Sequence, residues 1–564
     1  MSDTCKYKTV LPVCILLGIM SISCVLSMRL KSPTVDEFAH LPAGYYYWKT
    51  GDFSLYGKNP PLIRLLCALP LLSMDISIDT NASEAGAGNW RPWVFGTHFM
   101  RKNAAAYSRI FFVGRIPVVI LALILGIYVF RWARGLYGLR GGLLSLLLYS
   151  FSPNILAHSR LATTDMGCTC FMFIAVYYYW RSIRNNGRWA WIGAGICLGL
   201  ALLSKFTALL LLPIFLLLLP LSSRSKSKFW KPLKVGTLRL LEIIVVAVFI
   251  LNLGYGFQES FKTLRSIPHE SQFFSKLNRF PFNAVPLPIP AAYLSGFDRQ
   301  KLDSERGVFL NYLRGRLSTT GWWYYFIYAF VVKTPIPLHI GIIICILYAF
   351  GKRDRERDRL FLLIPVLVII VVFSFLNNIN VGLRYILPVF PFLFVWLGRL
   401  AQLRLRQVLP RWATGVLLVA YVTSSVSIFP DYLAYFNVLA GGPDRGCHHL
   451  LDSNLDWGQD LKRLKGYMEK NKIKEVGLAY FGHVDPAIYG IPYHLIGQHA
   501  ESGYVAVSAN YLYGLPYVIT YTTPPMSIRP GIYTWLRSFR PKANIGHTIY
   551  IYELKASSLQ LPGK

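Results

Sequence analysis

Charged residues are scarce in this chain, at 15% of its 564 residues, and they cluster between long apolar runs. Hydrophobic residues account for 54% of the chain, and the mean hydropathy is +0.40. A composition so poor in charge excludes an ordinary soluble protein. It is typical of a protein that crosses a membrane many times.

The chain also lacks internal repeats and long low-complexity linkers, and its nine cysteines have no metal-ligand spacing. Most of these cysteines lie inside apolar runs, where they serve as small hydrophobic residues. The sequence therefore offers few candidates for a disulfide.

Acidic residues are fewer than basic ones, with 27 Asp and Glu against 59 Lys and Arg, which gives a net charge of +32. In a soluble protein this excess would suggest a nucleic-acid partner, but no soluble region combines basic and aromatic residues in that way. Basic residues at the cytoplasmic ends of helices and against anionic lipid explain the excess better. We therefore expect the lipid bilayer, and no nucleic acid, as a partner.

Apolar runs of spanning length predict about eleven transmembrane helices. The first run resembles a signal peptide, but it is long enough to span and no small-residue cleavage site precedes DEFAH, so we predict a helix there. The runs lie near residues 10–29, 110–130, 141–157, 165–181, 189–204, 206–221, 240–256, 323–350, 360–376, 383–400 and 412–429.

The charge of the loops between these runs predicts the orientation. If the N-terminus is cytoplasmic, the inside loops include RWARGLYGLR, RSIRNNGR, SSRSKSKFWKPLK, GKRDRERDR and RLRQVLPR, each with a cluster of Lys or Arg. This agrees with the positive-inside rule, and the opposite orientation violates it. External loops are then expected at about 30–109 and 257–322, followed by an external segment from about 430.

This last segment, residues 430–564, predicts a soluble α/β domain. DWGQDLKRLKGYMEKN has the periodicity of a helix with Asp456 as its N-cap, and EVGLAYFG, YVAVSA and TIYIYEL have the pattern of strands. Asp452, Asp456 and Asp460 recur every four residues and could share a helix face. A cap followed by a solvated helix explains two of these acids without a function.

An acidic pair follows the first apolar run, in SPTVDEFAHL. The aromatic run from Tyr45 to Trp48 marks the membrane interface, so Asp36 and Glu37 are expected at the depth of the lipid headgroups. Solvated residues past a helix end, or caps of a helix beside the membrane, are the alternative interpretation.

Three further charges are expected near the same depth. Asp165, in AHSRLATTDMG, begins an apolar run, where a negative charge also stabilises a helix N-terminus. Lys205 lies in a short external turn, and Arg384 lies just inside the external end of a helix. Ionisable residues there are functional candidates, although snorkelling to the headgroups is an alternative. These boundary charges suit an enzyme for an anionic lipid headgroup better than a transporter, whose site lies at the midplane.

Several motifs resemble a known family. PTVDEFAHLPAGYYYWKTGDFSLYGKNPPLIRLLCALPLL, AHSRLATTDMG and GLALLSKFTALLLLP are similar to the multi-spanning C-type (GT-C) glycosyltransferases, in particular to the protein O-mannosyltransferase and aminoarabinose-transferase relatives of glycosyltransferase family 39. GWWYYFIYAFVVKTPIPL, VGLRYILPVFPF and DSNLDWGQDLKRL resemble a prokaryotic branch. Many relatives have EHPPL where this chain has KNPPL. This chain therefore lacks the acid–histidine pair, and the resemblance implies no role for that pair here.

The resemblance implies a fold, a location and substrates. It implies a GT-C transmembrane catalytic domain over residues 1–429, in the cytoplasmic (inner) membrane of a prokaryotic cell. The donor would be a sugar linked to polyprenyl phosphate. The acceptor would be a hydroxyl of a protein, a glycolipid or a polysaccharide, reached from the external face. We expect the C-terminal domain to recognise this acceptor or to act as a lid.

The resemblance also implies roles for individual residues. Asp36 matches the catalytic acid of the first external loop, Glu37 is its neighbour, and Asp165 matches the second acidic position. Lys205 and Arg384 match basic residues that hold the lipid phosphate. A carboxylate base and a single displacement predict inversion of the sugar.

Other chemistry stays open for these residues. A carboxylate could instead stabilise an oxocarbenium-like centre or act as a nucleophile. A divalent metal ion could bind Asp36, Glu37 and Asp165. Candidate contacts of the headgroup or acceptor are His40, His158 and Tyr385.

Two other classes of function remain as alternatives. A lipid or glycolipid transporter (flippase) would use the same charges to grip a phosphate headgroup. A scaffold without catalysis predicts that the Asp36 carboxylate is dispensable.

Overall fold

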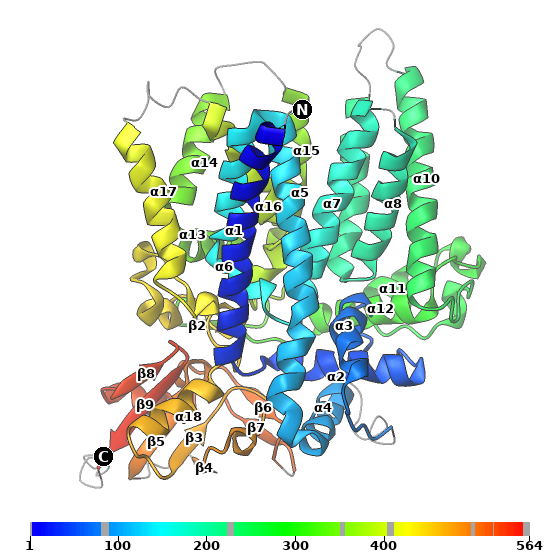
Figure 1. Cartoon of the computed structure of the whole chain (residues 1–564). Coiled ribbons are helices and arrows are strands. Elements are labelled where there is room, and N and C mark those ends of the chain that lie inside the picture. The colour runs from blue at the N-terminus through cyan, green and yellow to red at the C-terminus, as the bar shows by residue number, and fades with distance from the viewer. Residues whose placement is uncertain are drawn as a thin grey trace.

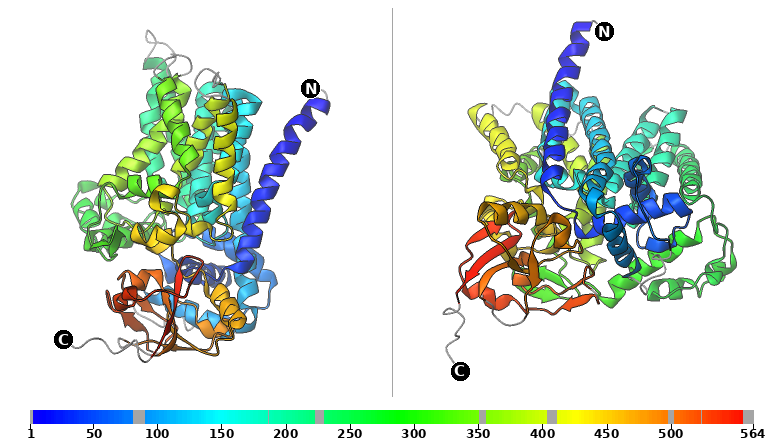
Figure 2. Two further views of the ribbon diagram at one scale, coloured as in Figure 1. Left: turned by 90° about the vertical axis from the view of Figure 1, so that its left-hand side faces the viewer. Right: turned by 60° about the horizontal axis from the view of Figure 1, so that its bottom comes forward.

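The computed structural model describes the greater part of the chain. The described residues are 3–80, 90–185, 187–222, 230–349, 356–402, 411–497, 502–522 and 524–555. Figure 1 shows long helices side by side above a smaller part that contains the strands, with the N-terminus and the C-terminus at opposite ends. Figure 2 shows that α1 leans away from the other long helices toward its N-terminus.

Several of the described helices form the long bundle. They are α1 (Asp3–Leu30), α5 (Tyr107–Ser150), α7 (Thr164–Asn185), α8 (Arg188–Leu202), α9 (Leu211–Leu218), α10 (Trp230–Gly254), α13 (Tyr325–Lys333), α14 (Ile336–Ala349), α15 (Glu356–Phe375), α16 (Val389–Leu397) and α17 (Arg411–Val426). The remaining helices are α2 (Val35–Thr50), α3 (Leu62–Ala68), α4 (Arg91–Lys102), α6 (Pro153–Ser159), α11 (Gln272–Leu277), α12 (Ala291–Arg306), α18 (Leu461–Lys470) and α19 (Ala509–Leu512).

Several helices are apolar and long enough to cross a membrane, which confirms a multi-pass helical membrane protein. Among the described residues, four helices pass this test alone, and two bent pairs raise the number to six. The other apolar runs form helices of ten to seventeen residues. The expected number of about eleven spans therefore stays a prediction.

Gly138 joins two of the predicted runs into a helical hairpin within α5. Its backbone (φ 75°, ψ −176°) is one that only glycine adopts readily. Beyond it the chain runs back along itself, so that the Tyr149 hydroxyl donates to the carbonyl of Ala122 at 2.7 Å. The second helix ends at Ser150 rather than at the predicted residue 157.

The span predicted over residues 323–350 consists of two helices rather than one continuous helix. The chain forms α13 and α14 there, bent by 114° at a break between Lys333 and Ile336. Thr334 is extended because the ring of Pro335 disfavours helical backbone in the preceding residue. Pro335 also lacks the N–H that would continue the helical hydrogen bonds.

The C-terminal segment contains a mixed five-stranded sheet in the order β4-β3-β5-β9-β8. β3 runs parallel to β4 and β5, while β9 is antiparallel to β5 and β8. The predicted strands overlap β3, β5 and β9. The strand bounds are β1 (Asn311–Leu313), β2 (Arg316–Ser318), β3 (Val476–Ala479), β4 (Tyr493–Leu495), β5 (Gly503–Ser508), β6 (Tyr517–Ile519), β7 (Met526–Ile528), β8 (Ala543–Ile545) and β9 (Ile549–Leu554).

The helix expected from Asp456 onward begins later, as α18, at Leu461. Upstream of it lies a short 3-10 turn, Asp452–Asn454, followed by a bend at Gly458, whose φ is 84°. The three acids of DSNLDWGQD therefore do not share a helix face, and the prediction of Asp456 as an N-cap is wrong.

Backbone hydrogen bonds join this acidic loop to the start of α2. The N–H of Ser32 donates to the carbonyl of Gln459 at 2.9 Å, and the N–H of Val35 donates to the carbonyl of Trp457 at 3.0 Å. The first residues of α2 are thereby held against the C-terminal segment, so the two contribute to one surface.

A buried ion network lies beside this junction. Lys31, whose side chain is fully buried, lies 2.5 Å from Asp460 and also pairs with Asp431. One apolar core continues from α1 to β9. The bundle and the sheet are therefore packed as one unit.

Asp456 makes the stability of this junction depend on pH. Its carboxylate accepts hydrogen bonds from the Ser508 hydroxyl and the Gly458 N–H, and burial raises its pKa to about 7. The folded protein therefore binds a proton more tightly than the unfolded chain, and the stabilisation is complete below pH ~4 and declines as pH rises through ~7. The melting temperature of the purified protein should fall between pH 5 and 8, less so in Asp456→Asn. The exposed control Glu469→Gln should keep the wild-type slope, and an equal slope in all three proteins would contradict this origin.

Candidate active site

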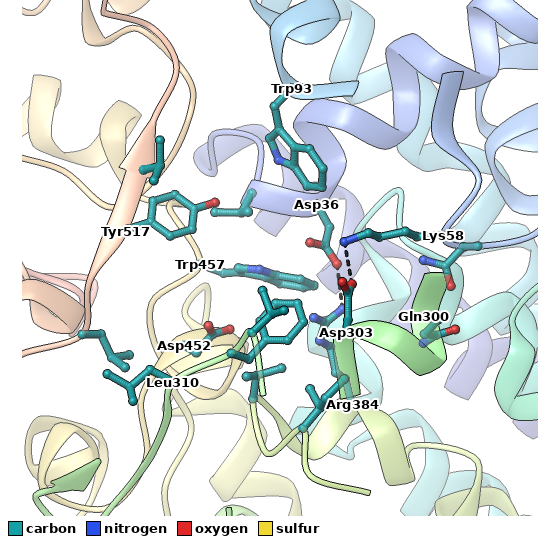
Figure 3. Close-up of a pocket in the computed structure, with 18 of the residues that line it drawn as sticks. Asp36, Lys58, Trp93, Gln300, Asp303, Leu310, Arg384, Asp452, Trp457 and Tyr517 are labelled. Atoms are coloured by element: carbon teal, nitrogen blue, oxygen red, sulfur yellow. Dashed lines mark hydrogen bonds and ion pairs between the residues drawn. The ribbon is translucent and has the colours of Figure 1, made fainter. Parts of the chain in front are cut away.

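A cavity of about 440 Å³ opens where the bundle meets the C-terminal segment. Its volume lies within the range of roughly 300–1,000 Å³ that is usual for small-molecule sites. Its wall combines the starts of α2 and α7, part of α12, the link between α15 and α16, and loops of the C-terminal segment. Figure 3 shows Tyr517 and Asp452 on one side of the view and Lys58 and Asp303 on the other.

Asp36 lies on this wall, in the first turn of α2. Its Oδ2 accepts a hydrogen bond from Nη1 of Arg384 at 2.7 Å. The Asp36 side chain is 20% exposed and that of Arg384 is 11% exposed, so the pair faces the cavity and is screened from bulk water on most sides. An ion pair in such a setting is stronger than the same pair at a surface.

Arg384 lies in a 3-10 turn, Leu383–Ile386, ahead of α16. Its Nε donates to the Ser453 hydroxyl at 3.1 Å, and its guanidinium lies over the Trp457 ring at 4.4 Å from the centroid. The chain passes this close to Ser453 because residue 382 is glycine: a Cβ there would lie 2.2 Å from the Ser453 oxygen. Burial alone would lower the pKa of Arg384, but the charge of Asp36 outweighs it and raises the pKa, so the guanidinium stays charged.

Asp165 and Lys205 form the second ion pair of the site. Lys205 Nζ lies 2.6 Å from Asp165 Oδ1, and the other oxygen of Asp165 is 3.7 Å from Nη1 of Arg384. Lys205 also lies over the Tyr385 ring at 4.6 Å, and Lys205 and Tyr385 both line the cavity. The structure thus brings together Asp36, Asp165 and the two predicted cations.

Glu37 turns away from the cavity, because neighbouring residues of a helix do not face the same side. Its carboxylate is fully buried and accepts hydrogen bonds from Arg115 Nε at 2.6 Å and Nη2 at 2.7 Å. It also accepts from the N–H of Thr34 at 2.9 Å and of Ala162 at 2.8 Å. Burial acts to raise its pKa, but the charge of Arg115 and these bonds outweigh burial and lower it. The alternative of a helix cap thus applies to Glu37, through its capping box with Thr34.

The two candidate histidines lie behind the wall of the cavity. His40 is buried with its ring centroid 5.2 Å from that of Tyr56, and His158 is buried 6.5 Å from that of Trp457. Burial lowers the pKa of His40 to about 4, which keeps it neutral at physiological pH. Of the three candidate contact residues, Tyr385 alone is part of the described cavity lining.

The carboxylates that the sequence suggested for a divalent metal do not form a ligand set. Asp36 is paired with Arg384, Glu37 with Arg115, and Asp165 with Lys205. A metal ion would have to displace a cation from each of them. In the part of the chain that the structure describes, no group of three His, Cys, Asp or Glu residues could hold a metal ion.

Sequence reasoning missed part of the wall. Lys58, from the unusual KNPPL motif, lies 2.5 Å from Asp303 of α12, and both line the cavity. The loop DSNLDWGQD contributes Asp452 and Trp457, and β6 contributes Tyr517. The repeated acids of that loop could have indicated a site there. The fold was needed to show that Asp452 is the one that lines the cavity.

Comparison with protein-family models gives one match that bears on this site. Residues 104–251 match the family described as dolichyl-phosphate-mannose-protein mannosyltransferase. Over these residues the chain is similar to that family. The segment contains Arg115, which pairs with Glu37. It also contains both members of the Asp165–Lys205 pair. The match confirms the resemblance seen in the motifs and the interpretation of the chain as a glycosyltransferase.

Several solved structures are also similar to this chain. ArnT from Cupriavidus metallidurans bound to undecaprenyl phosphate is 15% identical, with 97% of this chain and 99% of that chain covered and a TM-score of 0.45. The oligosaccharyltransferase AglB from Archaeoglobus fulgidus is 14% identical, with 91% and 71% covered and a TM-score of 0.43. The Saccharomyces cerevisiae Pmt1-Pmt2 complex is 17% identical, with 44% and 33% covered and a TM-score of 0.31. Comparison with curated proteins gives no match.

Proposed function

We propose that this chain moves a sugar from a polyprenyl-phosphate carrier to a hydroxyl acceptor on the external face of the inner membrane. The observation that carries the proposal is the 2.7 Å contact between Asp36 and Arg384 on the wall of one cavity. A carboxylate that can take a proton lies beside a cation that can bind a phosphate. The N-terminus is cytoplasmic and residues 430–564 are external, which the basic loops support.

Arg384 and Lys205 bind the phosphate of the donor. Arg384 uses Nη1 for Asp36 and Nε for Ser453, and among the described residues Nη2 has no hydrogen-bond partner. Lys205 uses one of its three donors for Asp165. Both side chains therefore keep donors for a phosphate without giving up their carboxylate partners. The lipid tail then leaves toward the bundle, on whose side these two cations lie.

Asp36 acts as the general base. The acceptor hydroxyl attacks the anomeric carbon while its proton passes to Asp36, and the bond from that carbon to the phosphate oxygen breaks. The electron pair leaves with the polyprenyl phosphate, whose developing charge Arg384 stabilises. A single displacement from the side opposite the phosphate inverts the configuration of the sugar.

Glu37 and Asp165 hold the reacting groups in position. Glu37 fixes the start of α2 to Arg115, and this determines where Asp36 points. Asp165 lies between Lys205 and Arg384 and keeps two like charges close together. Positioning of this kind contributes to the rate without a direct contact with substrate.

Turnover by the purified full-length protein in nanodiscs tests the proposal. The donors are a panel of polyprenyl-phosphate sugars, and the acceptors are proteins, glycolipids and polysaccharides. The expected result is release of polyprenyl phosphate together with transfer of the sugar label to an acceptor. Movement of intact donor across the bilayer without cleavage would contradict the proposal and favour a transporter.

Arg384→Gln should lower donor turnover about 100-fold, because a positioned cation no longer meets the charge that develops on the leaving phosphate. The same variant should bind polyprenyl phosphate more weakly. Arg384→Lys should recover only part of the loss, because lysine lacks the planar fork of donors. Arg540→Gln, an exposed site outside the cavity, is the matched control. Unchanged turnover in Arg384→Gln would remove Arg384 from the mechanism.

A further inference from the structure

The cavity has two chemically different sides. Its three lining cations, Lys58, Lys205 and Arg384, come from the bundle and its loops, and each is paired with a carboxylate. The side formed by the C-terminal segment contributes no lysine or arginine among the described lining residues. It contributes aromatic rings, two hydroxyl groups and one carboxylate.

That carboxylate is Asp452, which forms no ion pair with any residue that the structure describes. One of its oxygens accepts the N–H of Ser453. Its backbone is in the left-handed region (φ 56°) and is held there by Asn510, whose Oδ1 accepts the Asp452 N–H at 2.9 Å. A rare backbone conformation fixed by a buried side chain at a cavity is typical of functional positions.

Tyr517 is the second polar group of this side, and it is held by a buried histidine. Its hydroxyl and Nε2 of His483 are hydrogen-bonded at 2.7 Å, and Nδ1 of the same ring is 3.0 Å from the Thr520 hydroxyl. Burial lowers the pKa of His483 to about 3, so the ring is neutral. When Nε2 carries the ring proton, the Tyr517 O–H is available to donate into the cavity, and in the other tautomer its oxygen is available to accept.

We infer that Asp452, Trp457 and the Tyr517–His483 pair form a wall that binds a neutral sugar unit of the acceptor. The Arg384 guanidinium covers one face of Trp457, so the rest of the ring is what remains to pack on the C–H face of a pyranose, while a carboxylate and a phenol at the rim bind its hydroxyl groups. An acceptor phosphate would instead meet the charge of Asp452, while Arg384, the cation that lies over Trp457, is already paired with Asp36.

The inference rests on the proposed function, because displacement requires the acceptor to lie opposite the leaving phosphate. Arg384 and Lys205 place that phosphate on the side of the bundle, which leaves the C-terminal wall for the acceptor. Burial raises the pKa of Asp452 to about 6, so it is mostly ionised at neutral pH and accepts hydroxyl hydrogen bonds.

Binding of methyl hexopyranosides to the full-length protein in nanodiscs, measured by saturation-transfer NMR, tests the wall without turnover. The wild type should bind at least one glycoside at millimolar concentration. Asp452→Asn and Tyr517→Phe should each weaken this binding about tenfold, the effect of one lost hydrogen bond. Asp444→Asn and Tyr504→Phe, both on the same segment outside the cavity, are the matched controls. No glycoside binding, equal binding by all variants, or binding of inorganic phosphate that depends on Asp452 would overturn the inference.

Kinetics separate the acceptor from the donor and the wall from the reaction. In the wall variants the KM for a saccharide acceptor should rise about tenfold, while the Kd for polyprenyl phosphate stays within twofold. A rise in the KM for donor alone would assign the wall to the donor sugar and overturn the inference. If the protein turns over donor but binds no glycoside, the sugar-binding wall is rejected and the proposed function stands. Glycoside binding without turnover of any donor rejects the proposed function and, with it, the acceptor role of the wall.

Discussion

Asp36→Asn should lower kcat by roughly 100- to 10,000-fold, the range for loss of a general base. The amide keeps the shape of the side chain but cannot take the acceptor proton. Asp36 is partly exposed to the cavity, and Arg384 would retain Asp165 as a nearby carboxylate, so the fold should tolerate the change. The melting temperature and the Kd for polyprenyl phosphate should therefore remain close to those of the wild type. The measurement is donor turnover at saturating acceptor, alongside both of these properties.

The outcome separates the three classes of function that the sequence leaves open. Asp444→Asn, whose side chain is 76% exposed, is the control for the same chemical change. A scaffold predicts wild-type behaviour for both variants. A transporter predicts weaker headgroup binding in Asp36→Asn with no cleavage in either protein. Wild-type kcat in Asp36→Asn, with turnover established for the wild type, would show that another group takes the proton.

The bundle could be predicted from the sequence because apolar runs and basic loops are local signals. The runs near 110–130 and 141–157 correspond to the two helices of α5, and Gly138 supplies the reversal between them. Where the chain departs from one continuous helix, a short backbone feature is the cause. The proline after Thr334 bends a run that is apolar throughout, so the pattern of hydrophobicity alone gives no warning.

The candidate site was predictable in part, because charged residues at the edge of an apolar run are conspicuous. Which of them meet was not predictable, since Asp36 and Arg384 lie 348 residues apart in the chain. The two residues of the acidic pair also have different surroundings, although they are adjacent in the sequence. Asp36 faces the cavity, while Glu37 forms a buried ion pair with Arg115. The residues that the C-terminal segment adds to the cavity wall are positioned by β6 and by the bend at Gly458. The periodicity of hydrophobic residues in the sequence predicts neither feature.

Glu37→Gln should destabilise the fold by about 3–5 kcal/mol, the usual cost of breaking a buried ion pair. Arg115 is 1% exposed and donates to Glu37 through both Nε and Nη2, so the neutral variant leaves its charge uncompensated. The bonds from Thr34 and Ala162 would also weaken, because they lose a charged acceptor. The measurement is the melting temperature and the yield of folded protein in detergent.

A double-variant cycle tests whether this loss comes from the ion pair. Replacing both partners, as Glu37→Gln with Arg115→Met, should recover part of the stability, because no buried charge is then left alone. Glu469→Gln, on the exposed face of α18, should leave the melting temperature unchanged. A wild-type melting temperature in Glu37→Gln would contradict the structural role. If the fraction that folds keeps a large share of the wild-type kcat, Glu37 acts by positioning α2, and the chemistry at this acidic pair belongs to Asp36 alone.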